Sequence, residues 1–471
     1  MGDDLLAKLA KLAQPRLPAP LDSAFRPAAL ANRAYRKAVQ ESGRAVPLVI
    51  GLQRGDGTTS RYETRVFADG HPMAELNLPY AERIVKFLLW QKGGWQVTVG
   101  GPRSVGEYIS KVYSLDGPRA FDVDFMGPTV YERPFEIVLT DAEKVPAAHE
   151  VSVPLGRHLE GARIGFDLGA SDRKVSAVLD GEPVFTEEVV WEPRNQPDPS
   201  YHYREINAAL KAAAAELPRV DAIGGSSAGV IINNRPMIAS LFRGVPKDLF
   251  EAKVKRIFLD LAKEWGVPFQ VANDGDVTAL AGAMSLNDDC VLGIAMGSSE
   301  AVGYVDAKGN ITGWLNELAF APIDYYPDAP ADDWSVEAGV GSQYLTQPAV
   351  FRLARQVGIK LDEKASLADR LKSVQDLLEA GDANARSIWE TIGVYAGYAV
   401  AHYADFYQIK HVLLLGRVTS GSGGPIIFER ANQVLATEFP ELAGKIECHL
   451  PDEKTRRVGQ AVAAASLPAI T

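Results

Sequence analysis

The sequence is poor in cysteine, with only Cys290 and Cys448 among 471 residues. Two cysteines cannot build a disulfide framework, and no Cys-x-x-Cys or paired-histidine spacing indicates a zinc or iron–sulfur site. Long apolar runs are also missing, because no segment approaches the roughly 18 apolar residues that a membrane span requires. The N-terminus has no apolar signal-peptide core either. We therefore expect a cytoplasmic protein that does not interact with membranes.

A basic excess is missing as well. The net charge is −11 and the pI is about 5.3, which argues against electrostatic binding of nucleic acid or anionic lipid. Apolar residues make up 46% and charged residues 23% of the chain, a balance typical of a folded globular protein. Small molecules are the expected partners, and a homodimer is kept as an option.

The length predicts about three structural units, at roughly 150 residues for each. Residues 1–44 mix short helical patterns with a proline-rich stretch and resemble an arm. Residues 45–150 have the pattern of a small α/β domain, with a hairpin around Gly55-Asp56-Gly57 and strands near 120–125 and 134–139. After a polar, proline-containing boundary, two further α/β units are expected at 161–284 and 285–471.

Two of the expected strand–turn–strand segments have turns rich in small residues. Asp167 ends an apolar strand and precedes Gly169-Ala170-Ser171, and Gly297-Ser298-Ser299 follows the strand near 291–296. Nucleotide phosphates are bound well by backbone N–H groups in such tight turns, because small side chains allow close approach. Either turn alone fits an ordinary hairpin better, but the two together in this setting are more specific.

Two more segments carry polar groups at strand ends. Asn273-Asp274-Gly275-Asp276 ends an apolar strand, where carboxylates of open α/β sheets lie beside bound ligands. An aspartate there can accept a proton from a sugar hydroxyl, and the alternative is that Asn273 or Asp274 caps the following helix. The strand at 411–415 leads into Gly416-Arg417 and a Gly/Ser-rich loop that could contact an adenine ring or be a flexible linker.

The order of these motifs resembles the ROK family of repressors and sugar kinases, within the actin/hexokinase/Hsp70 superfamily, over about residues 161–467. The resemblance implies an α/β fold with two ribonuclease-H-like lobes and an interlobe cleft, to which an N-terminal α/β domain is added. It also implies a cytoplasmic kinase that uses ATP and Mg²⁺ to phosphorylate a sugar or sugar-like acceptor. The implied site comprises Asp274 as base, Asp167 on Mg²⁺ through water, Gly169, Ser171, Gly297, Ser298, Ser299, Gly416 and Arg417 on ATP, and Asn273, Glu317, Gly225 and Ser226 on the acceptor.

The sequence departs from the family pattern at several of these positions. Serines replace a threonine and a glycine in the phosphate turns, and the first turn has one extra residue. Asn316-Glu317-Leu318-Ala319-Phe320 stands where the family has a Gly-Glu-x-Gly-His motif, and the following segment contains no cysteine. We therefore expect no structural zinc there. The departures leave an alternative function open, a non-catalytic ROK-like protein that senses a carbohydrate or nucleotide.

Overall fold

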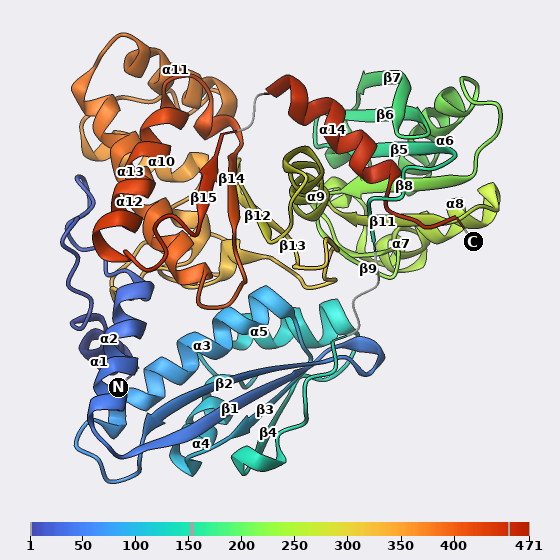
Figure 1. Ribbon diagram of the computed structural model, residues 1–471. Coiled ribbons are helices and arrows are strands. Elements are labelled where there is room, and N and C mark those ends of the chain that lie inside the picture. Colours follow the sequence, from blue (N-terminus) through green and yellow to red (C-terminus); the bar gives the residue numbers. More distant parts are fainter. Residues whose placement is uncertain (1, 151–154, 451–452, 471) are drawn as a thin grey trace. The chain divides into compact units, whose positions relative to one another are not determined.

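Residues 2–150, 155–450 and 453–470 are described by the computed structural model, which has a mixed α/β fold with four β-sheets (Figure 1). The chain divides into two compact units. The first unit comprises Met1–Val151, Ala295–Ala301 and Trp314–Leu450, and the second comprises Ser152–Ile294, Val302–Gly313 and Pro451–Thr471. The domain boundaries expected from the sequence stay a prediction. Among the described residues, no helix is both long and apolar enough to span a bilayer.

The second unit is built on a five-stranded sheet with the order β11-β8-β5-β6-β7. Strands β5, β6 and β7 form an antiparallel meander, whereas β8 pairs in parallel with both β5 and β11. The parallel pairs bring the carboxyl ends of β5, β8 and β11 to one edge of the sheet. The strands are β5 Ala162–Leu168, β6 Asp172–Leu179, β7 Glu182–Val190, β8 Ala222–Ser227 and β11 Phe269–Asn273, with the small sheet of β9 Val230–Ile232 and β10 Arg235–Ile238.

Helices cover both faces of this sheet, which explains why all seven residues of β5 are buried. Figure 1 shows α14 lying across β5 and β8. The approach is close because β8 has a glycine at position 224, where an added Cβ would lie 1.7 Å from the carbonyl oxygen of Ala464. The helices of the unit are α6 Pro199–Ala214, α7 Lys247–Ala252, α8 Ile257–Trp265, α9 Asp274–Leu286 and α14 Glu453–Ala465.

The N-terminal part of the first unit contains a four-stranded sheet of order β2-β1-β3-β4. The predicted hairpin is confirmed, since β1 and β2 pair in antiparallel register from Ala45↔Phe67 to Gln53↔Thr59. Helix α3 packs on this sheet through β1 and β2. The elements are α1 Gly2–Ala10, α2 Ala28–Glu41, β1 Ala45–Gln53, β2 Thr59–Phe67, α3 Asn77–Lys92, β3 Gln96–Gly100, α4 Arg103–Val112, α5 Ala120–Asp124, the π-helical η3 Phe125–Tyr131 and β4 Glu136–Thr140.

The strand predicted near 120–125 is wrong, because these residues form α5 and the start of η3. The alternation of Phe121, Val123 and Phe125 with aspartates suggested a half-exposed strand. In the structure Asp122 is buried completely and bonds to Lys86 and Trp90. The alternating pattern implied that Asp122 faces solvent, but in the structure it is buried in an ion pair with Lys86.

The rest of the first unit is mainly helical, with α10 Gln347–Gln356, α11 Leu367–Glu379, α12 Ala383–Tyr403 and α13 Gly423–Glu438. A further sheet has the order β13-β12-β14-β15. Its strands are β12 Val291–Met296, β13 Glu300–Val305, β14 His411–Leu415 and β15 Glu447–His449. Residues 295–296 of β12 and 300–301 of β13 belong to the first unit, and the other residues of these two strands belong to the second. The residues of 2–44 pack within this unit, as illustrated by Phe25, whose ring centroid lies 4.8 Å from that of Tyr395.

Candidate functional site

Asp167 lies near the carboxyl end of β5 in the second unit, and its side chain is buried. Its Oδ1 accepts a hydrogen bond of 2.7 Å from the Ser226 hydroxyl and a longer one of 3.4 Å from the Gln460 amide. Burial raises the pKa of the Asp167 carboxyl, while the bond from Ser226 and the positive charge of Lys174 oppose the rise. Lys174 stands directly opposite Asp167 in the β5–β6 register. The carboxylate therefore has a cation beside it.

Asp274 is the first residue of α9, immediately after β11. Burial raises the pKa of its carboxyl to about 6, and the charge of Asp167 adds to the rise. Strand β8 separates β5 from β11, so the two strands lie about 10 Å apart at the usual interstrand spacing. The structure thus brings Asp167 and Asp274 to one edge of one sheet. The pKa of the Asp274 carboxyl is close to the range of a general base.

Asn273 caps the N-terminus of α9. Its side-chain oxygen accepts from the Gly275 N–H at 2.7 Å, and its amide nitrogen donates to the Gly229 carbonyl at 2.9 Å. The helix-capping alternative from the sequence is confirmed for this residue. Both ends of the amide already have backbone partners, so contact of Asn273 with an acceptor stays a prediction.

Gly225 and Ser226 of β8 both make internal contacts. Ser226 is fully buried and donates to Asp167, which fixes the orientation of that carboxylate. Gly225 leaves room for the ring of Phe166, because an added Cβ would lie 2.1 Å from the Phe166 Cζ. Both residues therefore have structural roles at this edge of the sheet, and their contact with a ligand stays a prediction.

The first predicted phosphate turn joins β5 to β6 as a hairpin. The Gly169 N–H donates to the Asp172 carbonyl at 2.9 Å, and the exposed Ser171 hydroxyl donates to the Asp172 carboxylate at 3.1 Å. Asp172 also pairs with Lys174 at 3.0 Å. An acidic side chain inside this turn opposes an incoming phosphate unless Lys174 compensates its charge.

The second predicted phosphate turn, Gly297-Ser298-Ser299, joins β12 to β13, and its three residues belong to the first unit. Ser298 and Ser299 are exposed, and the Gly297 N–H donates to the Ser299 carbonyl at 3.0 Å. Gly416, at the end of β14, lies against the end of β12 with a φ of 96°. A Cβ there would lie 2.5 Å from the Met296 carbonyl oxygen, so this position requires glycine. The turn and the loop that carries exposed Arg417 are therefore neighbours.

Glu300 was not predicted from the sequence, although it directly follows the second turn. Its side chain is 2% exposed, and its Oε1 accepts from the Tyr403 hydroxyl at 3.0 Å. The pKa of the Glu300 carboxyl is raised to about 8, mainly by burial; the charge of Glu317 contributes to the rise, and the hydrogen bond from Tyr403 opposes it. A protonated carboxyl thus lies beside the serine turn and close to the predicted acceptor ligand Glu317. Only its buried environment distinguishes Glu300 from an ordinary surface glutamate.

The segment that carries Glu317 is held by the C-terminal end of α3. The Glu317 N–H donates to the Trp90 carbonyl at 2.9 Å, and the Asn316 N–H donates to the Gln91 carbonyl at 3.0 Å. Phe320, which stands where the family has a histidine, packs with its ring centroid 4.6 Å from that of Trp90. Residues of the N-terminal part therefore set the backbone position of Glu317.

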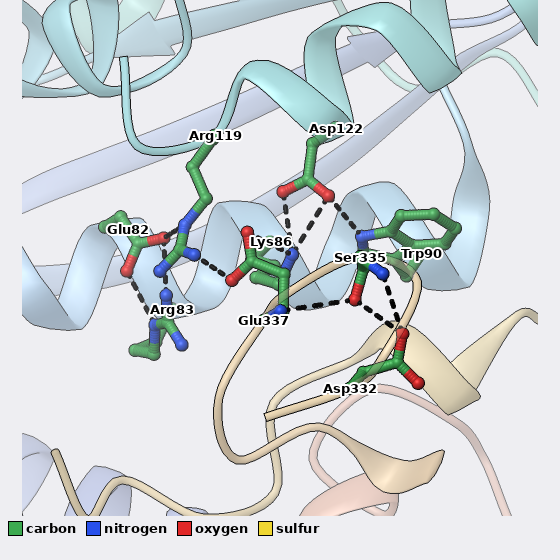
Figure 2. Close-up of polar contacts among 9 residues, drawn as sticks. All are labelled: Glu82, Arg83, Lys86, Trp90, Arg119, Asp122, Asp332, Ser335 and Glu337. Atoms are coloured by element: carbon green, nitrogen blue, oxygen red, sulfur yellow. Dashed lines mark hydrogen bonds and ion pairs between the residues drawn. The ribbon is translucent and has the colours of Figure 1, made fainter. Parts of the chain in front are cut away.

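Figure 2 shows how the cysteine-free segment after Phe320 is fixed by buried charges. Lys86 of α3 is fully buried, with its Nζ 2.9 and 2.8 Å from the two carboxylate oxygens of Asp122 and 3.7 Å from Glu337. Glu337 also pairs with Arg119, and Asp332 accepts from the Ser335 hydroxyl at 3.0 Å. Ion pairs to α3 and to the residues before α5 thus order the segment from 332 to 337.

The predicted site residues are divided between the two units. Those of the second unit are Asp167, Gly169, Ser171, Gly225, Ser226, Asn273 and Asp274, and those of the first unit are Gly297, Ser298, Ser299, Glu317, Gly416 and Arg417. In the second unit the structure brings Asp167, Ser226 and Asp274 to one sheet edge, and in the first unit it places Gly416 against the end of β12; that the other predicted residues share a site with them stays a prediction. Lys174 and Glu300 were not among the residues predicted from the sequence. Lys174 could have been found, because it lies two positions after Asp172 and therefore on the same face of β6.

Comparisons with known proteins rest on structure alone, because no family model and no curated protein matches the chain. A ROK hexokinase from Thermus thermophilus matches with a TM-score of 0.50 and 18% identity, covering 64% of this chain and 97% of that one. A ROK family transcriptional regulator, a homolog of the E. coli MLC protein, matches with a TM-score of 0.52 and 18% identity, covering 66% and 79%. The resemblance predicted for about two-thirds of the chain is confirmed at the level of the fold.

Proposed function

We propose that this chain, which has the fold of ROK proteins, is an ATP-dependent kinase. It transfers the γ-phosphate to a hydroxyl of a sugar or sugar-like acceptor. The observation that supports it best is the pair of carboxylates at one sheet edge of the second unit, where the pKa of Asp274 is raised to about 6. Asp274 is the general base of this proposal, since such a group is ionised at neutral pH and basic enough to accept a proton.

The residues around Asp167 fit a hydrated Mg²⁺ ion bound with ATP. Mg²⁺ keeps several of its waters and is commonly bound through one or two carboxylates together with phosphates. Asp167 is held by Ser226, and Lys174 opposite it supplies a positive charge for phosphate oxygens. When bound, Mg²⁺–ATP supplies the phosphoryl group and neutralises the charge that develops on it.

The protein's own contribution is to orient the two reactants and to hold the proton. In this proposal Asp274 accepts the proton of the attacking hydroxyl through its carboxylate, and Glu317 and Asn273 orient the acceptor. The adenosine and phosphates are bound by Gly416, Arg417 and the serine turns. The proposed architecture has an arm at 1–44, an α/β domain at 45–150, and two ribonuclease-H-like lobes at 161–284 and 285–471 that close on a cleft. We propose a cytoplasmic location.

A second candidate function is a ROK-like module that senses a carbohydrate or nucleotide without catalysis. The observation that favours it is Asp172, whose carboxylate lies within the first turn and accepts from Ser171. This arrangement places negative charge where phosphate would bind, and it engages the serine that would contact phosphate. A sensor requires ligand binding but no transfer of phosphate.

Asp274→Asn separates these functions, because the amide preserves size and removes the base. We expect ATP binding to remain and turnover to fall by about 10²- to 10⁴-fold. Turnover is measured as ADP release in the presence of Mg²⁺–ATP and a panel of sugars, and binding as a thermal shift. Asp248→Asn is the matched control, since Asp248 is an exposed carboxylate of the same unit.

Unchanged turnover in Asp274→Asn would remove this residue from the mechanism. Stabilisation of the wild-type chain by sugars alone, with no ADP release, would favour the sensor.

A further inference from the structure

Three side chains with metal-binding atoms gather where β14 and β15 begin, in the first unit. His411 Nδ1 lies 3.0 Å from His449 Nε2, and Glu447 Oε2 lies 3.9 Å from the first and 4.0 Å from the second. The three atoms all lie within 4.8 Å of one another. No residue of the predicted kinase site belongs to this group, so the cluster requires a separate explanation.

The strand register accounts for the cluster. Strands β14 and β15 are parallel, with His411 opposite Glu447 and Leu413 opposite His449. Alternate residues of a strand share a face, so Glu447 and His449 lie on the face that His411 shares. Cys448, between them, is directed to the other face and is buried in the protein. The sheet itself therefore holds these three donors together.

We propose that His411, His449 and Glu447 bind one divalent transition-metal ion through Nδ1, Nε2 and a carboxylate oxygen. Imidazole nitrogens with a carboxylate form a donor set suited to Zn²⁺, Cu²⁺ or Ni²⁺, whereas Mg²⁺ and Ca²⁺ require mainly oxygen.

The distances suit an ion of this size. Zinc binds imidazole nitrogen at about 2.0–2.1 Å, so two ligands of one ion lie at most about 4.2 Å apart. The nitrogen pair at 3.0 Å meets this limit already. The Glu447 side chain is 67% exposed and can rotate to shorten its two longer distances.

The bound ion would link the two strands at one end. Strand β15 has only three residues and is the edge strand of its sheet, so few backbone hydrogen bonds hold it. At its opposite end β14 leads into Gly416 and Arg417. The site is distinct from the zinc loop of the ROK pattern, which the sequence lacks, and it does not depend on the proposed kinase activity.

The test uses the full chain, freed of metal with a chelator and titrated with Zn²⁺ in competition with a chromophoric chelator. We expect one ion bound by each chain. His411→Ala and His449→Ala should each weaken binding by about 100-fold or more, and Glu447→Gln by about 10-fold, on the scale known for metal-site residues. His149→Ala is the matched control, because His149 is an exposed histidine of the same unit outside the cluster.

Binding to the native state also raises the unfolding temperature, which provides a second measurement. The Zn²⁺-dependent rise should disappear in both histidine variants and persist in His149→Ala. Circular dichroism with chelator present checks folding, and His411→Gln replaces His411→Ala should the alanine variant fail to fold. The proposal is overturned by a wild-type chain without saturable Zn²⁺ binding below millimolar concentration, or by equal affinity in wild type and both histidine variants.

Discussion

Replacing Glu300 by glutamine should change how the stability of the first unit depends on pH. The pKa of the Glu300 carboxyl is raised from 4.5 to about 8 by burial. Between these values the folded protein keeps a proton that the unfolded chain has lost. The stabilising contribution of the raised pKa is therefore fully present below pH 4.5 and is lost as pH rises through 8.

The magnitude follows from the width of this interval. Each pH unit corresponds to about 1.4 kcal/mol for one proton, so 3.5 units give about 5 kcal/mol as the full effect. Glutamine does not titrate, and its carbonyl oxygen can still accept from Tyr403. The free energy of unfolding of Glu300→Gln relative to wild type should thus increase by several kcal/mol between pH 5 and pH 8.

The assay is urea unfolding of both proteins at pH 5, 6, 7 and 8, followed by circular dichroism, with hydrogen exchange at the amides of β13 as the local readout. Glu429→Gln is the control, because Glu429 is exposed on α13 of the same unit. Parallel stability curves for wild type and Glu300→Gln would refute the reasoning. They would mean that Glu300 ionises in the folded protein as it does in water.

Two further predictions concern the packing that supports the site. Lys86→Met should destabilise the first unit by about 3–5 kcal/mol, because it leaves the buried Asp122 charge without its partner. In urea unfolding, the double variant Lys86→Met/Asp122→Leu should recover most of this lost stability. A double variant as unstable as Lys86→Met would contradict the ion-pair explanation. Gly224→Ala should cost about 1–3 kcal/mol by forcing α14 away from the sheet. Gly55→Ala, which has open space around its Cβ, is the control in thermal unfolding, and an equal change in both variants would contradict the close approach of α14.

The sequence was most informative where local pattern and topology agree. Asp167 lies at the end of one apolar strand and Asp274 directly after another. Parallel strands end at the same edge of a sheet, so the proximity of the two residues could be predicted from strand order. The β1–β2 hairpin was equally accessible, because a glycine turn separates two strand-like runs. The hairpin and the two strand ends are set mainly by residues close in the sequence, so they can be predicted with little knowledge of tertiary contacts.

Burial by distant segments could not be predicted in the same way. Glu300 has the sequence environment of a surface residue, and only Tyr403 and the surrounding core make it a buried acid. His411 and His449 are 38 residues apart, which no metal-binding spacing rule covers. The alternation around Asp122 suggested a strand with this residue facing solvent. Its partner Lys86 lies in another helix, so the buried ion pair could not be predicted from the local sequence.

The N-terminal part is integral to the acceptor side of the proposed site. The loop from 316 to 337 contains no cysteine or histidine, and its polar groups have partners elsewhere in the first unit. Lys86 and Arg119 supply them to Glu337, and α3 supplies carbonyl acceptors to the backbone of Asn316 and Glu317. Because single buried charges are costly, neither the loop nor α3 can keep these groups buried without the other. The segment from 77 to 124 and the segment from 316 to 337 therefore form one structural assembly, and the position of Glu317 depends on both.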